Sequence, residues 1–178
     1  MQSQQRIWDP LIRLFHWSVA AGFLLNFTLT EEGETLHEWI GYYILAALLV
    51  RVCWGFIGPR NARFSDFFPR KPGLKSHLRE LAQGQIKQHA GHTPLGGLMV
   101  MLLMAGLLLV GLSGWLTTTD MFWGEDWVED VHEFFANLTL LLVLVHVAAV
   151  TLFSVLGPAN LVRQMLTGRR CTRKLNKN

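Results

Sequence analysis

Residues 97–116 form a run of 20 positions without one charged side chain. A helix of about 20 apolar residues matches the ~30 Å hydrocarbon core of a bilayer. Three other apolar stretches approach this length, at 11–30, 40–57 and 134–156. The 178-residue chain is 51% hydrophobic and 16% charged, which argues against disorder. The sequence therefore predicts an all-α membrane protein, a four-helix transmembrane bundle.

Cap and stop residues set the expected ends of these helices. Thr93 is a good N-cap with Pro94 at the first helical position, and Gly58-Pro59 and Gly157-Pro158 stop the helices before them. The helices are expected at about 11–30, 35–57, 94–117 and 129–156.

Charged residues separate onto two sides of the predicted bundle. The segment 31–38, which joins the first two helices, holds four acidic residues and no Lys or Arg. The segment 117–133, which joins the last two, holds six acidic residues and no Lys or Arg. The N-terminal segment, the loop 58–93 and the tail 157–178 hold 15 of the 16 Lys and Arg. Because basic segments stay inside, both termini are expected to be cytoplasmic. Topology explains the basic segments, so we expect lipid and no nucleic acid as a partner.

The whole chain, 1–178, is interpreted as a single transmembrane domain. The basic loop 58–93 and the basic tail 157–178 are its two large cytoplasmic segments. Within the loop, residues 74–88 carry leucines at helical spacing. This pattern fits an interfacial amphipathic helix and, nearly as well, a solvated loop.

Four of the seven histidines fall within the expected helices or at their outer ends: His16, His37, His132 and His146. Ionisable side chains inside a membrane are costly and usually functional. His132 and His146 are 14 residues apart, so they lie on one side of their helix and ~21 Å apart along it. Because successive helices alternate in direction, His16 matches the depth of His146, and His37 that of His132.

Two histidines facing each other in an apolar bundle suit the two axial positions of a b-type haem iron. A zinc ion would bring further ligands, and the inner layer offers none. Ala20, Gly41 and Ala136 each follow a candidate ligand by one turn and would leave room for a flat macrocycle. Close packing between helices explains these small residues equally well.

Two arginines are candidates to neutralise a haem propionate. Arg51 follows His37 by 14 residues, so it shares the face of that histidine at the depth of the inner layer. Arg13 is the second candidate. Snorkelling to the inner interface is the alternative for Arg51. Thr139 could bond to an imidazole or fill space.

Four segments together resemble the prokaryotic cytochrome b561 family, which includes the cytochrome b subunits of nickel–iron hydrogenases. They are RLFHW at 13–17, LHEWIG at 36–41, RVCWG at 51–55 and HEFFANLTLLLVLVH at 132–146. The resemblance runs from Arg6 to about Gly168. It implies a four-helix bundle in the bacterial inner (cytoplasmic) membrane with two haem b groups. The family's ligand positions match the pairs His16 with His146 and His37 with His132.

A haem iron with two protein ligands has no open site, so its task is one-electron transfer. The resemblance implies exchange with quinone, and acidic outer loops would steer a basic partner such as a periplasmic c-type cytochrome. An electron-transfer subunit is therefore favoured over a stand-alone enzyme. The alternatives are a self-sufficient superoxide:quinone oxidoreductase and, in another class, a haem-free histidine-dependent transporter. No quinone pocket can be placed from the sequence.

Overall fold

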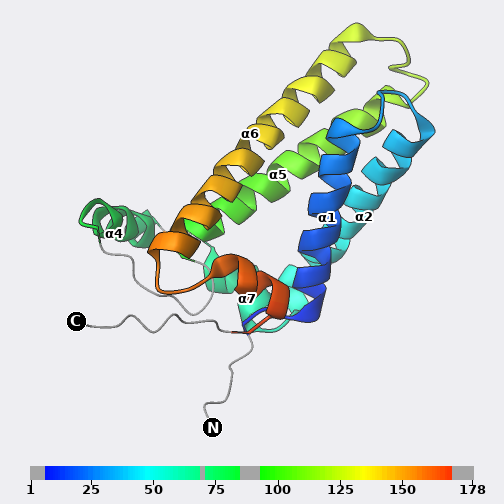
Figure 1. Ribbon diagram of the computed structural model, residues 1–178. Coiled ribbons are helices and arrows are strands. Elements are labelled where there is room, and N and C mark those ends of the chain that lie inside the picture. The colour runs from blue at the N-terminus through cyan, green and yellow to red at the C-terminus, as the bar shows by residue number, and fades with distance from the viewer. Residues whose placement is uncertain (1–6, 69–70, 85–92, 170–178) are drawn as a thin grey trace. The chain divides into compact units, whose positions relative to one another are not determined.

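The computed structural model describes residues 7–68, 71–84 and 93–169 (Figure 1). In this part of the chain the regular structure is helical, which confirms the expected all-α class. The elements are α1 (Pro10–Thr28), α2 (Thr35–Ile57), the 3-10 turn η1 (Arg60–Ala62), α3 (Phe64–Phe67), α4 (Lys71–Ala82), α5 (Pro94–Thr117), α6 (Asp126–Leu156) and α7 (Leu161–Thr167).

Four of these helices, α1, α2, α5 and α6, are long and apolar enough to cross a membrane. They have 19, 23, 24 and 31 residues, against the ~20 that a bilayer core requires. The protein is therefore a multi-pass membrane protein, as predicted.

Two helix ends differ from the sequence expectation. α6 begins at Asp126, three residues before the expected start. Its first turn holds Asp126 and Glu129, which the helix dipole stabilises although they lie outside the apolar stretch. α1 ends at Thr28, two residues early. The hydroxyls of Thr28 and Thr30 each donate to the carbonyl four residues earlier, and such bonds compete with the helical backbone ladder.

The chain forms two compact units. Unit 1 contains the described residues of 1–13, 54–100 and 144–178, and unit 2 contains residues 14–53 and 101–143. Unit 1 thus includes α3, α4 and α7, whereas unit 2 includes the loop that joins α1 to α2 and the loop that joins α5 to α6.

In unit 1, the segment before α1 is bonded to the end of α7 (Figure 1). The amide of Ile7 donates to the carbonyl of Gly168 at 2.8 Å, and Gly168 closes α7 in the left-handed conformation with φ 71°. Arg13 donates through Nε to the carbonyl of Met165 at 3.1 Å, and through Nη2 to that of Leu166. These bonds satisfy carbonyls that the last helical turn leaves open. They join the two ends of the described chain, which an even number of membrane crossings would place on the same side of the membrane.

Glycines in unit 1 allow α3 to pack closely against α2 and α5. A Cβ on Gly55 would lie 2.1 Å from the ring of Phe64, and a Cβ on Gly97 would lie 2.3 Å from the carbonyl oxygen of Phe67. The rings of Phe64 and Phe67 are 5.7 Å apart between centroids. Since a backbone oxygen cannot move aside as a ring can, Gly97 is the more constrained of the two glycines.

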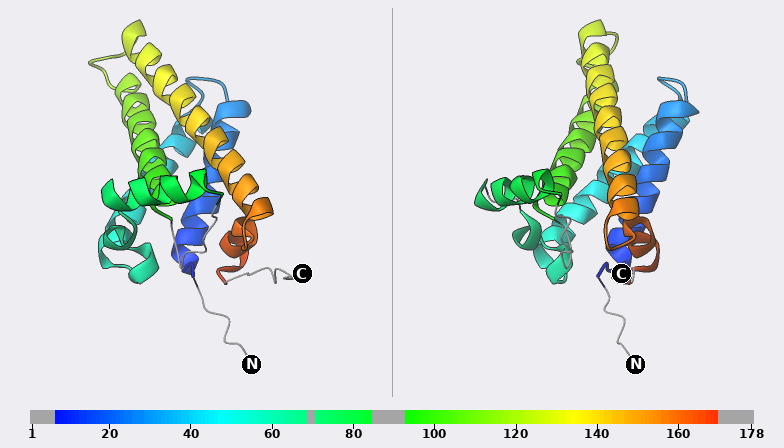
Figure 2. Two further views of the ribbon diagram at one scale, coloured as in Figure 1. Left: turned by 90° about the vertical axis from the view of Figure 1, so that its left-hand side faces the viewer. Right: turned by 60° about the vertical axis from the view of Figure 1, so that its left-hand side comes forward.

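Of the two alternatives for the basic loop, a helix or a solvated loop, the structure shows a helix, α4. It covers Lys71–Ala82 and lies crosswise to the first turns of α5 (Figure 2). His77 is buried, whereas the neighbouring Leu78 is exposed, so the helix presents two different faces. Residues 85–88 of the expected segment lie outside the described residues.

Unit 2 has a core to which all four long helices contribute. Val19 and Phe23 of α1 and Ile44 of α2 are buried, and residues of α5 and α6 pack against them, among them Leu107 and Leu140. The buried contacts therefore hold two antiparallel pairs of helices together, α1 with α2 and α5 with α6.

Thr139 is fully buried in α6, where a Cβ on Gly106 would lie 2.6 Å from its hydroxyl oxygen. Within the described residues this hydroxyl has no hydrogen-bond partner. Of the two alternatives from the sequence, Thr139 thus fills space between α5 and α6.

We expect Gly97→Ala to destabilise the protein by about 1–3 kcal/mol, because its methyl group would overlap the Phe67 carbonyl. Thermal unfolding in detergent, followed by circular dichroism, measures the loss. Gly73→Ala is the matched control, since a Cβ there meets nothing within 4 Å and alanine favours the helix. Equal unfolding temperatures for the two variants would contradict the packing described for α3.

Candidate functional site

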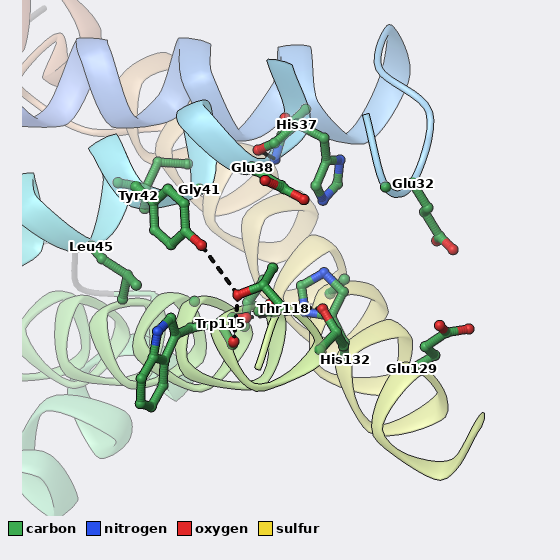
Figure 3. Close-up of a pocket in the computed structure, with 18 of the residues that line it drawn as sticks. Glu32, His37, Glu38, Gly41, Tyr42, Leu45, Trp115, Thr118, Glu129 and His132 are labelled. Atoms are coloured by element: carbon green, nitrogen blue, oxygen red, sulfur yellow. Dashed lines mark hydrogen bonds between the residues drawn. The ribbon is translucent and has the colours of Figure 1, made fainter. Parts of the chain in front are cut away.

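Unit 2 contains a cavity of about 490 Å³ lined by all four long helices. His37 of α2 and His132 of α6 both line it, and their side chains lie close to each other (Figure 3). The ring centroids are 6.1 Å apart, with an interplanar angle of 74°. The structure thus places together the two histidines that the sequence assigns to the outer layer.

The positions of these rings follow from helix geometry. His37 lies in the first turn of α2 and His132 in the second turn of α6, so both lie near the N-terminal end of their helix. Gly41 and Ala136, one turn further on, also line the cavity. A Cβ on Gly41 would meet nothing within 4 Å, so this glycine borders open space. Small residues were expected to leave room for a macrocycle beside the candidate ligands, and the open space at Gly41 is compatible with this expectation.

α5 determines the orientation of His132. The Nδ1 atom of the ring lies 3.0 Å from the carbonyl oxygen of Val110 and 3.2 Å from the hydroxyl of Ser113. A carbonyl can only accept, so Nδ1 carries the proton and donates it to Val110. The other nitrogen, Nε2, then keeps its lone pair, which is the form of histidine that binds a metal.

Gly114 makes this contact between α5 and His132 possible. A Cβ at that position would lie 2.8 Å from the Cε1 atom of the ring. Gly111, three residues earlier, lines the same cavity. No site residue was expected in this helix from the sequence. A signal was present, because Ser113 stands between two glycines at helical spacing within a long apolar run.

On the opposite side, one residue of α1 and one residue of the α1–α2 loop hold His37. The hydroxyl of Thr30 lies 3.1 Å from Nδ1 of the ring. Asn26 donates from Nδ2 to the backbone carbonyl of His37 at 3.1 Å. Neither residue was expected from the sequence, because neither belongs to a motif.

The spacing and the space suit a planar group held between two imidazoles. Two metal–nitrogen bonds of about 2 Å each, with the ring atoms behind them, span about 6 Å between ring centres. The 6.1 Å separation of His37 and His132 agrees with this value. A volume of about 490 Å³ also lies within the range of roughly 300–1,000 Å³ for cofactor and ligand sites.

The expected inner pair is divided between the two units. His16 lies in α1 within unit 2, half-buried, with its ring centroid 5.0 Å from that of Trp17. His146 lies in α6 within unit 1 and is also half-buried. The pairing of His16 with His146 therefore stays a prediction.

The two arginine candidates differ in their surroundings. Arg51 is only 3% exposed, which argues against the snorkelling alternative. Arg13 is engaged by the last carbonyls of α7. Its suggested role at a propionate stays a prediction, as does that of Arg51.

We expect Gly41→Leu to lower the haem content by about one haem per chain, because the side chain would fill the space beside His37. Haem is measured against protein in the purified sample. Ala46→Leu is the matched control, since Ala46 lies on the exposed side of α2. A full haem content in Gly41→Leu would show that the cavity is not the binding site.

Comparison with known families agrees with this geometry. The sequence model for prokaryotic cytochrome b561 matches residues 7–168, a range that includes all four long helices. No curated protein and no solved structure gives a significant match. The family consists of membrane b-type cytochromes, so the haem-free transporter hypothesis was wrong. The chain belongs to the prokaryotic cytochrome b561 family and is a membrane-embedded, haem b-binding protein of electron transfer.

Proposed function

We propose that this protein carries electrons across the bacterial inner membrane between the quinone pool and a periplasmic redox partner such as a c-type cytochrome. The observation that supports the proposal most directly is the pair His37 and His132, with ring centroids 6.1 Å apart at a cavity. Both Nδ1 atoms have partners in the protein, which leaves both Nε2 atoms to a metal.

In this proposal the protein holds two haem b groups. His37 and His132 are the axial ligands on the outer side, and His16 and His146 are those on the inner side. A haem iron with two protein ligands supplies one-electron chemistry and offers no open position to oxygen or substrate. The buried Arg51 would neutralise a propionate, with Arg13 as the second candidate.

The proposed orientation follows the charge distribution. Unit 1 contains the described parts of the basic loop and tail, whereas unit 2 contains both acidic loops. Basic residues remain on the cytoplasmic side of a membrane. Both termini would therefore be cytoplasmic, and the cavity of His37 and His132 would lie towards the periplasm.

Acidic residues at the cavity favour a cationic protein partner over an anionic small substrate. Glu32, Glu38 and Glu129 line the cavity together with the two histidines (Figure 3). These carboxylates would attract a partner with a basic rim and repel superoxide. A self-sufficient superoxide:quinone oxidoreductase is therefore the less favoured alternative.

The ligand assignment can be tested by single substitutions. We expect about two non-covalent haems per chain by pyridine haemochrome analysis, one for each histidine pair. His37→Ala and His132→Ala should perturb one redox component, and His16→Ala and His146→Ala the other. His77→Ala, a buried histidine outside both pairs, should leave both components in place. If His16→Ala and His132→Ala perturbed the same redox component, the proposed pairing would be wrong.

The partner can be tested by charge reversal. Glu31, Asp120 and Glu125 are exposed and do not line the cavity. Replacing all three with Lys should lower the association rate with a cationic c-type cytochrome by about tenfold at low salt. The wild-type rate should also fall as salt rises, because exposed charges are screened over ~10 Å at 0.1 M. Stopped-flow oxidation of the reduced protein measures both effects.

Lys75→Glu with Arg79→Glu in α4 is the matched control and should leave this rate unchanged. The superoxide alternative makes the opposite prediction for the acidic loops. Removing negative charge there should leave the rate with superoxide unchanged or raise it. A charge-reversed protein that reacts normally with every cationic cytochrome tested would argue against a docking partner on this face.

A further inference from the structure

We propose that Thr30 is a positioning residue that fixes which nitrogen of His37 carries the proton, and that it thereby lowers the reduction potential of the outer haem. This inference rests on the proposed role of His37 as an axial ligand. The supporting feature is the hydrogen-bond network that joins Thr30, Asn26 and His37 at the end of α1.

The hydroxyl of Thr30 has three neighbours. Its Oγ1 lies 2.8 Å from the backbone oxygen of Asn26, 3.1 Å from the side-chain oxygen of Asn26 and 3.1 Å from Nδ1 of His37. A hydroxyl has one proton to donate and two lone pairs to accept with. The two oxygens of Asn26 can only accept, so one of them receives the proton of Thr30.

The orientation of Asn26 is itself fixed. Its Nδ2 donates to the backbone carbonyl of His37 at 3.1 Å, which turns its Oδ1 towards Thr30. The hydroxyl of Thr30 therefore presents a lone pair to His37. Nδ1 of the ring must supply the proton of this bond, and Nε2 is left with the lone pair that a metal requires.

The two proposed ligands of this site are held in different ways. Nδ1 of His132 donates to a backbone carbonyl, that of Val110, at 3.0 Å. Ser113 is a second neighbour, but its own proton goes to the carbonyl of Leu109 at 2.8 Å or of Val110 at 3.0 Å. Replacing Thr30 removes the acceptor of His37, whereas the Val110 carbonyl beside His132 belongs to the backbone and stays when side chains are replaced.

A hydrogen bond from Nδ1 makes an imidazole a stronger electron donor through its other nitrogen. Stronger donation stabilises ferric over ferrous iron, and hydrogen bonding around the ligands is one of the means by which proteins set haem potentials. Loss of the Thr30 acceptor should therefore raise the potential. Thr30 is half-buried in the turn after α1, so water replaces its hydroxyl poorly.

The test is a redox titration of purified haem-loaded variants, read on the component that His37→Ala removes. Thr30→Val should raise the equilibrium constant for reduction about threefold to tenfold, or about 30–60 mV for one electron. Thr30→Ser keeps the hydroxyl and should restore the wild-type value. The electron paramagnetic resonance signal of the same ferric haem should change in Thr30→Val and return in Thr30→Ser.

A control variant separates this role from general effects. Thr28 lies two residues before Thr30, and within the described residues its hydroxyl bonds to the Leu24 carbonyl. Thr28→Val should therefore leave the potential unchanged. If Thr30→Val fails to retain haem, Thr30→Ala replaces it in the titration with the same expected direction.

An unchanged potential in Thr30→Val, with normal haem content, would overturn the inference. It would leave the proposed function intact as long as His37→Ala removes one haem. If His37→Ala instead retains both haems, His37 is not a ligand, and the proposed site fails together with the inference. A shift of equal size in Thr28→Val would mean that hydroxyls in this turn act through the fold, which also overturns the role of Thr30.

Discussion

The constraint on which the rest of this structure depends is that a peptide backbone in lipid must satisfy its own hydrogen bonds. In this chain the four candidate spans satisfy it as helices, so functional side chains project from helix faces or from the loops at the ends. The cavity of His37 and His132 is placed accordingly, near the ends of α2 and α6. Polar groups that lie deeper need an internal partner or a packing role. Thr139 against Gly106 is an example of the second case.

The same constraint explains how much the sequence could predict. Long apolar runs cannot form anything but spanning helices, so α2 and α5 can be located from hydropathy and cap residues alone. The outer histidine pair could also be predicted, because depth along antiparallel helices depends only on residue counts. The ends of the helices were predicted less accurately than their existence. α6 begins three residues before its apolar stretch, because capping turns and the helix dipole, rather than hydrophobicity, decide where a helix starts.

The surroundings of the proposed ligands could not be predicted, because they depend on how helices rotate and approach one another. Val110 acts through its backbone carbonyl, and no pattern of side chains reveals which carbonyl a distant histidine will reach. Gly114 contributes by having no side chain. Arg13 was the second candidate for a propionate, yet it lies at the carbonyls that end α7, a helix that was not predicted from the sequence.

The length of α6 has a consequence for molecular recognition. At about 1.5 Å per residue its 31 residues extend about 46 Å, against ~30 Å of hydrocarbon. Even a tilt of 40°, the upper end of the usual range, leaves about 35 Å along the membrane normal. Part of α6 therefore stands in the headgroup region or in water, and its acidic first turns are the part suited to that environment. A helix already holds these carboxylates at fixed spacing, so a protein that binds them loses little conformational entropy in ordering them.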